Sequence, residues 1–300
     1  MRDVLIAGAG GQLGIELGRI DWGEDVRLVQ PSRAELDLTS IDSVTAFFER
    51  YSLAAVVNAA GYTAVDRAEA EVGQAFAANA LGPALLAGAT ARAGIPIIQI
   101  STDYVFSGDK DGCYEEDDST GPISVYGASK LAGELAIRSG NPRSVIVRTA
   151  WLLSPHRTNF LKTMLRLSTA NPEIDVVADQ IGCPTSATDL AEVIKTFVLT
   201  HLSDVAAPVG VYHFVNAGDV SWCDLANAIF ELDAVGAPRA RARPITTAEY
   251  PALARRPANS RLSSAKVERE LGIVARPWRD AVADIIAELH QAENLEGAHQ

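Results

Sequence analysis

A short apolar run near the start of the chain leads directly into a cluster of glycines. Residues 4–7 are followed by Gly8, Gly11 and Gly14 in the spacing G-x-x-G-x-x-G, and a helical pattern begins inside the cluster. Glycines there permit a tight turn and let backbone N–H groups approach a diphosphate at a helix N-terminus. The alternative is an ordinary strand–helix turn, but the strand before and the helix after favour a dinucleotide-binding unit.

The same alternation of strand and helix continues through the first half of the chain. Short β-branched runs occupy residues 4–7, 26–30, 55–59, 95–100 and 144–148, and helical patterns lie between them. Nearly continuous apolar strands are buried on both faces, and this alternation implies right-handed βαβ units. We therefore expect an α/β fold with a doubly wound, Rossmann-type parallel sheet over residues 1–150 and a return segment near 186–215. A smaller α/β lobe that binds substrate should occupy mainly residues 151–300.

Composition excludes several classes of protein. The 26 Lys and Arg residues are outnumbered by 38 Asp and Glu, giving a net charge of −12, whereas nucleic acids and anionic membranes attract basic surfaces. Cys113, Cys183 and Cys223 form no C-x-x-C motif, and the five histidines lack the spacing of metal ligands. No apolar run reaches the length of a membrane span, and no signal-peptide pattern begins the chain. These features predict a soluble, cytoplasmic protein without a structural zinc site.

The end of the second predicted strand bears on the choice of cofactor. An NAD site commonly has Asp or Glu there to hold the ribose 2′-hydroxyl. Here the sequence reads Gln30-Pro-Ser32-Arg33, and Ser32 with Arg33 can receive a 2′-phosphate. This favours NADPH over NADH, although Arg33 could equally be a solvated charge. Downstream, Asp37 can accept a hydrogen bond from the adenine amine, and Leu38 can cover the ring.

A second group of polar residues suggests carbonyl reduction. Thr102 ends the fourth predicted strand, and Tyr126 and Lys130 lie four residues apart at the start of a helix, on one face. An ammonium beside a phenol favours the phenolate, so we expect Lys130 to lower the pKa of Tyr126 from its ordinary value near 10. A hydroxyl at Thr102 can orient a substrate carbonyl. Together the three side chains predict a device that delivers a proton to a carbonyl receiving hydride.

These motifs resemble the extended short-chain dehydrogenase/reductase superfamily and, within it, the dTDP-4-dehydrorhamnose reductases. The glycine turn and the Tyr126/Lys130 pair indicate only the superfamily. The reductases are indicated by stretches beginning N-A-A-G-Y-T-A-V-D at residue 58, S-T-D-Y-V-F at 101, D-Q-I-G-C-P-T at 179 and A-R-R-P-A-N-S-R-L at 254. The motifs run in order over nearly the whole chain.

The resemblance implies reduction of the C4 ketone of dTDP-4-dehydro-L-rhamnose by NADPH or NADH. Tyr126 would donate the proton, Lys130 would hold the nicotinamide ribose, and Thr102 would position the substrate. The implied cofactor-binding residues are Gly8, Gly11, Gln12, Leu13, Gly14, Gln30, Ser32, Arg33, Asp37, Leu38, Gly61, Tyr62, Thr63, Ile100, Tyr126 and Lys130. The implied substrate-binding residues are Thr102, Asp103, Trp151, Asn159, Arg255 and Arg256, with Gln180 as a weaker candidate. Arg255 and Arg256 are the candidates for the diphosphate, because guanidinium groups match phosphate oxygens; a surface charge pair is the alternative.

Some members of this family dimerise around a magnesium ion held by carboxylates. Glu16 and Glu288 fall at matching positions, but Thr188 stands at the third. We therefore predict no metal, and we expect Glu16 to be solvated on an exposed helix face. The chain could be a monomer or a homodimer.

Two other functions stay open. Another nucleotide-sugar enzyme, an epimerase or a dehydratase, would use bound cofactor transiently. A dehydratase commonly has two acids after the strand-end threonine, and here only Asp103 follows Thr102. A non-catalytic subunit of the kind that regulates methionine adenosyltransferase has no need to keep Tyr126, Lys130 and Thr102 together.

Overall fold

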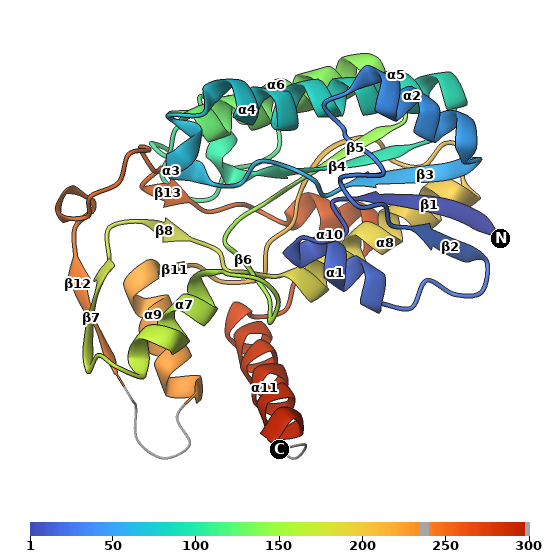
Figure 1. Ribbon diagram of the computed structural model, residues 1–300. Helices are drawn as coiled ribbons and strands as arrows, with labels where there is room; N and C mark the ends of the chain where they lie inside the picture. Colours follow the sequence, from blue (N-terminus) through green and yellow to red (C-terminus); the bar gives the residue numbers. More distant parts are fainter. Residues whose placement is uncertain (234–239, 298–300) are drawn as a thin grey trace.

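The computed structural model describes residues 1–233 and 240–297, and a parallel sheet of six strands lies at its centre (Figure 1). The strand order is β10-β5-β4-β3-β1-β2, and every neighbouring pair is parallel. The strands are β1 (Arg2–Ala7), β2 (Val26–Val29), β3 (Leu53–Asn58), β4 (Ile97–Thr102), β5 (Ser144–Thr149) and β10 (Gly210–His213). The predicted doubly wound α/β sheet is confirmed.

Helices cover both faces of this sheet. On the upper face in Figure 1 lie α2 (Ile41–Arg50), α4 (Val72–Phe76), α5 (Gly82–Ala93) and α6 (Val125–Gly140). Below lie α1 (Gln12–Arg19), α8 (Ala187–Ser203) and α10 (Ala265–Leu271). Successive residues of β1 alternate between the two cores: Val4 and Ile6 belong to the lower one, and Leu5 belongs to the upper one. Because both faces are buried, the strands read as continuous apolar runs.

The helical run over residues 72–93 is not α-helical throughout. Between α4 and α5 the backbone forms a π-helical segment, Ala77–Leu81, which contains the buried Asn79. Such segments are uncommon and frequently lie at functional sites. Asn79 holds the turn after β3.

A smaller lobe lies beneath one end of the sheet (Figure 1). It contains α7 (Phe160–Ser168), α9 (Trp222–Asp233) and α11 (Trp278–Gly297), together with short strands. The strands form the pairs β7 (Glu173–Val177) with β12 (Arg241–Ile245) and β6 (Leu152–Leu153) with β9 (Thr185–Ser186), and a sheet of β11 (Val220–Ser221), β8 (Ile181–Gly182) and β13 (Asn259–Ser260). A separate apolar core, with Leu161, Leu225 and Ile285 among its members, holds the lobe together.

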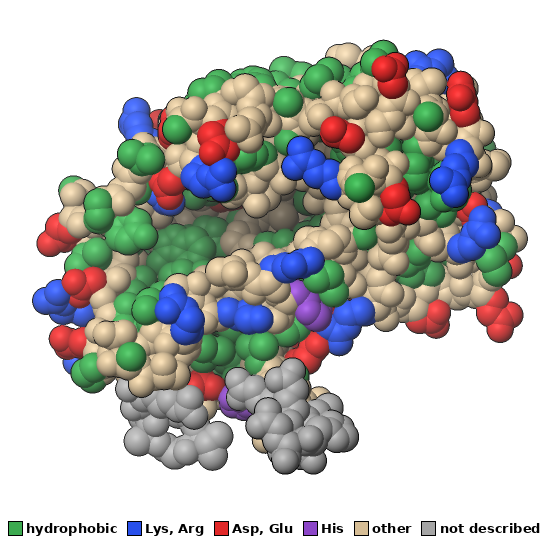
Figure 2. Space-filling view, in the orientation of Figure 1, with side chains coloured by type: hydrophobic (Ala, Val, Ile, Leu, Met, Phe, Trp, Pro, Cys, Tyr) green, Lys and Arg blue, Asp and Glu red, His purple; other side chains and the backbone are tan. Residues whose placement is uncertain are grey.

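The chain returns from this lobe to the large sheet. Helix α8 packs against α1, and β10 extends the sheet beside β5. Figure 2 shows a hollow between the upper layer and the lobe, with Lys and Arg side chains along its lower rim. Within the described residues, no helix is long and apolar enough to cross a membrane.

Candidate active site

The glycine turn after β1 is closely packed on one side and open on the other. Gly8 has a φ of +83°, and a Cβ there would lie 2.5 Å from the backbone nitrogen of Ala60. A Cβ on Gly14 would lie 2.2 Å from the carbonyl oxygen of Gly8, so only glycine fits either position. Gly10 and Gly11 are exposed. The turn therefore presents bare backbone to solvent at the start of α1.

The N-terminus of α1 is suited to an anion. Side chains of Ser or Asn cap α2, α6, α7 and α8, but none in the described parts of the chain caps α1, whose N-cap is Gly11. Its first N–H groups are therefore available to a phosphate. Leu13 is buried, so only its backbone could contribute, whereas the Gln12 side chain already accepts hydrogen bonds from Ser154 and Asn159. These features fit the diphosphate of a dinucleotide cofactor.

The residues after β2 include a carboxylate that the sequence reasoning missed. The backbone N–H and the hydroxyl of Ser32 both donate to Glu35, each at 2.8 Å, and these hydrogen bonds lower the pKa of Glu35. Arg33 is exposed, and the Gln30 amide packs against Gly18 of α1. The S-x-x-E spacing could have predicted the Ser32–Glu35 contact. The Arg33 cation and the Glu35 carboxylate thus both lie near the predicted binding site of the cofactor's adenosine.

Asp37 and Leu38 lie just beyond, before α2. The Asp37 carboxylate accepts hydrogen bonds from the backbone N–H and the hydroxyl of Thr39, at 2.9 and 2.7 Å, and these lower its pKa. Leu38 is partly buried and packs close to Gly82 at the start of α5. This loop is therefore ordered by its own hydrogen bonds.

Thr102, Tyr126 and Lys130 converge where β4 ends and α6 begins. Ser124 caps α6, which lets Tyr126 enter the first turn, and Gly127 packs so closely on the Tyr104 carbonyl that a Cβ would lie 2.1 Å from it. Lys130 Nζ donates to the Ile100 carbonyl oxygen at 2.5 Å. The ring of Tyr126 meets that of Tyr104 edge-on, with centroids 5.6 Å apart.

The pKa of Tyr126 differs from the sequence-based expectation. Burial raises the pKa of Tyr126 to about 12, although a hydrogen bond with Thr102 opposes the rise. Burial lowers the pKa of Lys130 to about 8, against the attraction of Glu134. The expectation that Lys130 lowers the pKa of Tyr126 is therefore wrong for this structure. The reason is that desolvation dominates, and the ammonium is turned toward Ile100.

The turn after β3 is held from the upper helices. Asn79 Oδ1 accepts from the backbone N–H of Tyr62 at 2.8 Å, and Asn79 Nδ2 donates to the Tyr62 carbonyl and to Ser129 Oγ, both at 3.0 Å. This buried amide links the segment of Gly61, Tyr62 and Thr63 to α6. Sequence reasoning missed Asn79, and a lone Asn within an Ala-rich helical pattern was the available signal.

Asp103 lies next to Thr102 and is nearly inaccessible. Thr102 Oγ1 donates to Asp103 Oδ1 at 2.7 Å, and Asp103 Oδ2 is buried without a hydrogen-bond partner among the described residues. Burial raises the pKa of Asp103 to about 6, although hydrogen bonds with Ser260 and Thr102 oppose the rise.

Trp151 follows β5 with a positive φ of 45°, which is unusual for a bulky residue. Trp222 stacks on its indole with centroids 3.5 Å apart and planes at 9°. Gly182 approaches the same indole so closely that a Cβ would lie 2.4 Å from it. One face of Trp151 is therefore already covered, and at most the other is available to a sugar.

The two arginines of the A-R-R-P stretch differ in exposure and in ion pairing. Arg256 forms a bidentate pair with Asp66 of α3 (Val65–Ala68), at 2.6 and 3.2 Å. Arg255 is exposed and makes no ion pair within the described residues. Asn159 donates to Gln12 beside the glycine turn at 2.8 Å, and the buried Gln180 donates to Thr247 at 3.0 Å. Arg255 is thus the freer cation, and the Asn159 amide is already engaged near the cofactor turn.

Comparison with known proteins accords with this geometry. A family model described as "RmlD substrate binding domain" matches residues 1–291. A dTDP-4-dehydrorhamnose reductase of Sinorhizobium fredii is 42% identical over 94% of this chain and 95% of its own. The crystal structure of a dTDP-4-dehydrorhamnose reductase from Clostridium acetobutylicum has a TM-score of 0.90 and 38% identity, covering 96% of this chain and 99% of that one.

The chain belongs to the dTDP-4-dehydrorhamnose reductase family. Another solved relative, the reductase of Bacillus anthracis in complex with NADP, has a TM-score of 0.89 and 35% identity, covering 96% of this chain and all of that one.

The magnesium site of some members of this family does not fit the residues here. Glu16 is buried rather than solvated, which corrects our expectation, because α11 and the segment before α7 pack over this face of α1. The Arg19 guanidinium lies between the two carboxylates, 3.5 Å from Glu16 and 2.6 Å from Glu288, and His156 lies 3.0 Å from Glu16. A cationic side chain thus stands between the two carboxylates.

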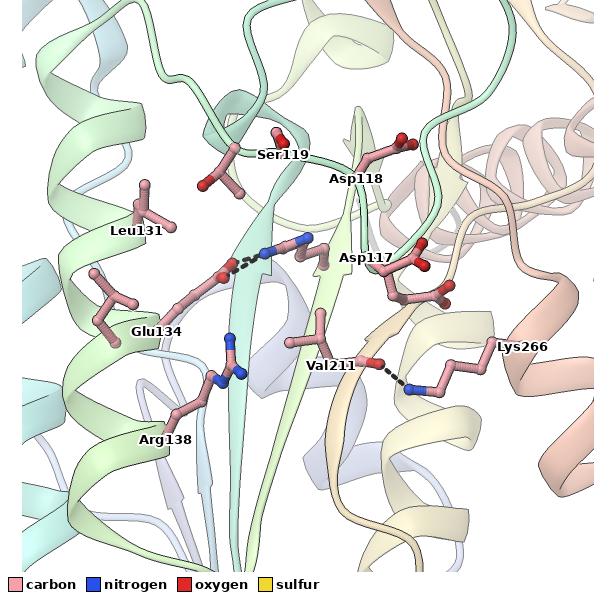
Figure 3. A pocket seen from close by; sticks show the side chains of 12 residues that line it. Asp117, Asp118, Ser119, Leu131, Glu134, Arg138, Val211 and Lys266 are labelled. Atoms are coloured by element: carbon pink, nitrogen blue, oxygen red, sulfur yellow. Dashed lines mark hydrogen bonds and ion pairs between the residues drawn. The ribbon is translucent and has the colours of Figure 1, made fainter.

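A cavity of about 480 Å³ lies apart from the family's predicted site residues, none of which lines it (Figure 3). Its wall includes the buried Glu134–Arg148 pair, joined at 2.7 Å, and Lys266, which donates to the Val211 carbonyl. Acidic side chains of the loop 116–118 line the other side. The pair fastens α6 to β5 below the turn that carries Tyr126.

Proposed function

We propose that this chain transfers hydride from NADPH, or from NADH, to the C4 ketone of dTDP-4-dehydro-L-rhamnose and so forms dTDP-L-rhamnose. The single observation that carries the proposal is the convergence of Thr102, Tyr126 and Lys130 at the end of β4, on the same sheet as a glycine turn that fits a dinucleotide. Family membership supplies the substrate class.

In this proposal the bound cofactor supplies the hydride, and the protein supplies the proton and the geometry. A pKa of about 12 keeps the Tyr126 hydroxyl protonated at neutral pH, so that it can donate to the C4 oxygen as negative charge develops there. Thr102 orients the carbonyl. Lys130 turns from Ile100 to hold the nicotinamide ribose hydroxyls.

We assign the two ends of the site to different elements. The turn after β1, the segment after β2, the Asn79-held turn and Ile100 would bind cofactor. Asp103, the face of Trp151 turned away from Trp222, and Arg255 would bind the dTDP-sugar. Arg256 is already paired with Asp66 and would shape the wall rather than contact phosphate.

We propose that residues 1–150, with a return segment near 186–215, form the cofactor-binding domain. Residues 151–300 form mainly the substrate-binding lobe. This division is supported by α8 and β10, which join the large sheet, and by the separate core of the lobe. A cytoplasmic location suits the three unpaired cysteines, two of which are buried. Light scattering of the purified protein distinguishes a monomer from a homodimer.

The decisive experiment incubates purified protein with dTDP-4-dehydro-L-rhamnose and NADPH or NADH in parallel. We expect oxidation of one equivalent of cofactor for each dTDP-L-rhamnose formed, with NADPH preferred. Isomerised or dehydrated sugar without net oxidation would instead identify an epimerase or a dehydratase. Binding of a methionine adenosyltransferase without turnover would identify a regulatory subunit.

A further inference from the structure

The segment between β6 and α7, residues 154–159, reaches from the lobe to the glycine turn. Gln12 Oε1 accepts hydrogen bonds from Ser154 Oγ at 2.9 Å and from Asn159 Nδ2 at 2.8 Å. His156 in the same segment lies against Glu16 of α1. We call residues 154–159 the bridging segment, because its side chains join two parts of the chain about 140 residues apart in sequence.

Arg157 stands at the centre of the bridging segment and points at the turn. Its Nε donates to the Gly10 carbonyl oxygen at 2.7 Å, and its Nη2 lies 3.4 Å from the place that a Cβ on Gly10 would occupy. Its two terminal nitrogens donate to none of the described residues, and the side chain is exposed. Arg157 thus holds the turn with one nitrogen and leaves the outer edge of its guanidinium open.

The backbone of Arg157 is unusual for a residue with a long side chain. Its φ of 57° lies in the left-handed region, which costs free energy for residues other than glycine and which persists where the surroundings over-determine it. Here the surroundings are the hydrogen bonds of Ser154 and Asn159 on either side. This conformation places the guanidinium over the glycine turn.

The proposed ligand is an anion that needs cationic partners. A dinucleotide diphosphate carries two negative charges, but residues 8–14 include no Lys or Arg. Arg19, in the last turn of α1, is occupied by Glu288 and Glu16. A guanidinium offers paired N–H donors that match phosphate oxygens.

We propose that Arg157 binds the diphosphate of the nicotinamide cofactor from the lobe side of the cleft. This proposal rests on the proposed function for the presence of that cofactor. It makes the cofactor a link between the lobe and the large sheet, because one arginine would contact the turn and the ligand together.

The test removes the cation without straining the backbone. Arg157→Gly keeps the positive φ at no cost, and we measure NADPH affinity by fluorescence titration without sugar substrate. We expect the affinity to fall about tenfold or more, the scale of hydrogen bonds to a charged group. The matched control Arg166→Ala removes the same charge from an exposed position on α7 and should change affinity less than twofold.

A second ligand shows where the effect acts. Adenosine 2′-monophosphate lacks the diphosphate, so its affinity should be the same for wild type and for Arg157→Gly. Should the glycine variant not fold, Arg157→Asn serves instead, because Asn tolerates the left-handed region. Arg157→Lys should recover part of the affinity.

Unchanged NADPH affinity in Arg157→Gly would overturn the proposal, and so would an equal loss for both ligands. Failure of the proposed function would give a different result from failure of the Arg157 proposal. A wild-type protein that binds NADPH but does not reduce the dTDP-sugar would remove the proposed substrate and leave the role of Arg157 to be decided by the titrations.

Discussion

Lys130 donates a hydrogen bond to the carbonyl oxygen of Ile100 at 2.5 Å, and so joins the first turns of α6 to the end of β4. The contact brings the helix that carries Tyr126 to the strand that carries Thr102. In the proposed mechanism the ammonium exchanges this partner for a ribose hydroxyl.

Tyr126→Phe should reduce kcat about 100-fold or more, because the phenol is the proposed proton donor. NADPH affinity should stay unchanged, since the ring is kept. Tyr104→Phe is the matched control and should keep kcat near the wild-type value. It removes the hydroxyl of a neighbouring tyrosine, whose ring meets that of Tyr126 edge-on. Steady-state kinetics with dTDP-4-dehydro-L-rhamnose measure both variants. Wild-type turnover in Tyr126→Phe would remove Tyr126 as the donor.

Asp103→Asn should raise stability at neutral pH. The folded-state pKa of Asp103 is about 6, above its ordinary value of 3.8, so the folded protein holds the proton more tightly than the unfolded chain. The stabilisation from this proton is fully present below about pH 4 and is lost as the pH rises through 6. Asn is neutral throughout, so its advantage should grow by about 3 kcal/mol as the pH rises from below 4 to above 7.

Urea unfolding at pH 4.5 and 7.5 checks this dependence. Asp117→Asn, at an exposed position in the nearby loop, is the control and should show little difference between the two values. An Asp103→Asn variant less stable than wild type at pH 7.5 would show that the carboxylate itself is needed for folding.

Glu134→Ala should destabilise the protein by about 3–5 kcal/mol, because it leaves the buried Arg148 charge without its partner. Asp175→Ala breaks the exposed pair with Arg243 and should cost less than about 1 kcal/mol. Chemical denaturation of the two variants measures the difference. Equal losses would mean that burial of the Glu134–Arg148 pair has no energetic consequence.

Gly14→Ala should weaken NADPH binding about tenfold or more, since its Cβ would lie 2.2 Å from the Gly8 carbonyl and force the turn to move. Gly73→Ala, on α4, meets no atom within 4 Å and should bind cofactor normally. Fluorescence titration compares them. Normal affinity in Gly14→Ala would show that the turn can shift without losing the diphosphate.

Arg33→Asp should move the preference from NADPH toward NADH, because an acid would repel a 2′-phosphate and accept from a 2′-hydroxyl. Glu35→Gln should act in the opposite direction, since it removes the negative charge held by Ser32. The ratio of kcat/KM for the two cofactors is the measurement. A ratio that neither substitution changes would place both residues outside the adenosine site.

The fold class and the candidate site residues could be predicted from the sequence. Strand and helix periods, the glycine turn and the four-residue spacing of Tyr126 and Lys130 are local patterns, and local backbone geometry is encoded locally. The large sheet and its two covered faces followed from these patterns. The sequence motifs also indicated the dTDP-4-dehydrorhamnose reductase family, as the comparisons confirmed.

Which charges remain free and how strongly each group is desolvated depend on contacts between distant parts of the chain. The pairing of Arg256 with Asp66 joins residues 190 positions apart, and the approach of Arg157 to Gly10 joins residues 147 positions apart. The buried Glu16 contacts His156, 140 positions away. No sequence period links such positions, because their contacts depend on how the lobe packs against the sheet. The pKa of Tyr126 is raised by burial, and burial is a property of the whole fold. The four-residue spacing between Tyr126 and Lys130 describes only a single turn of helix.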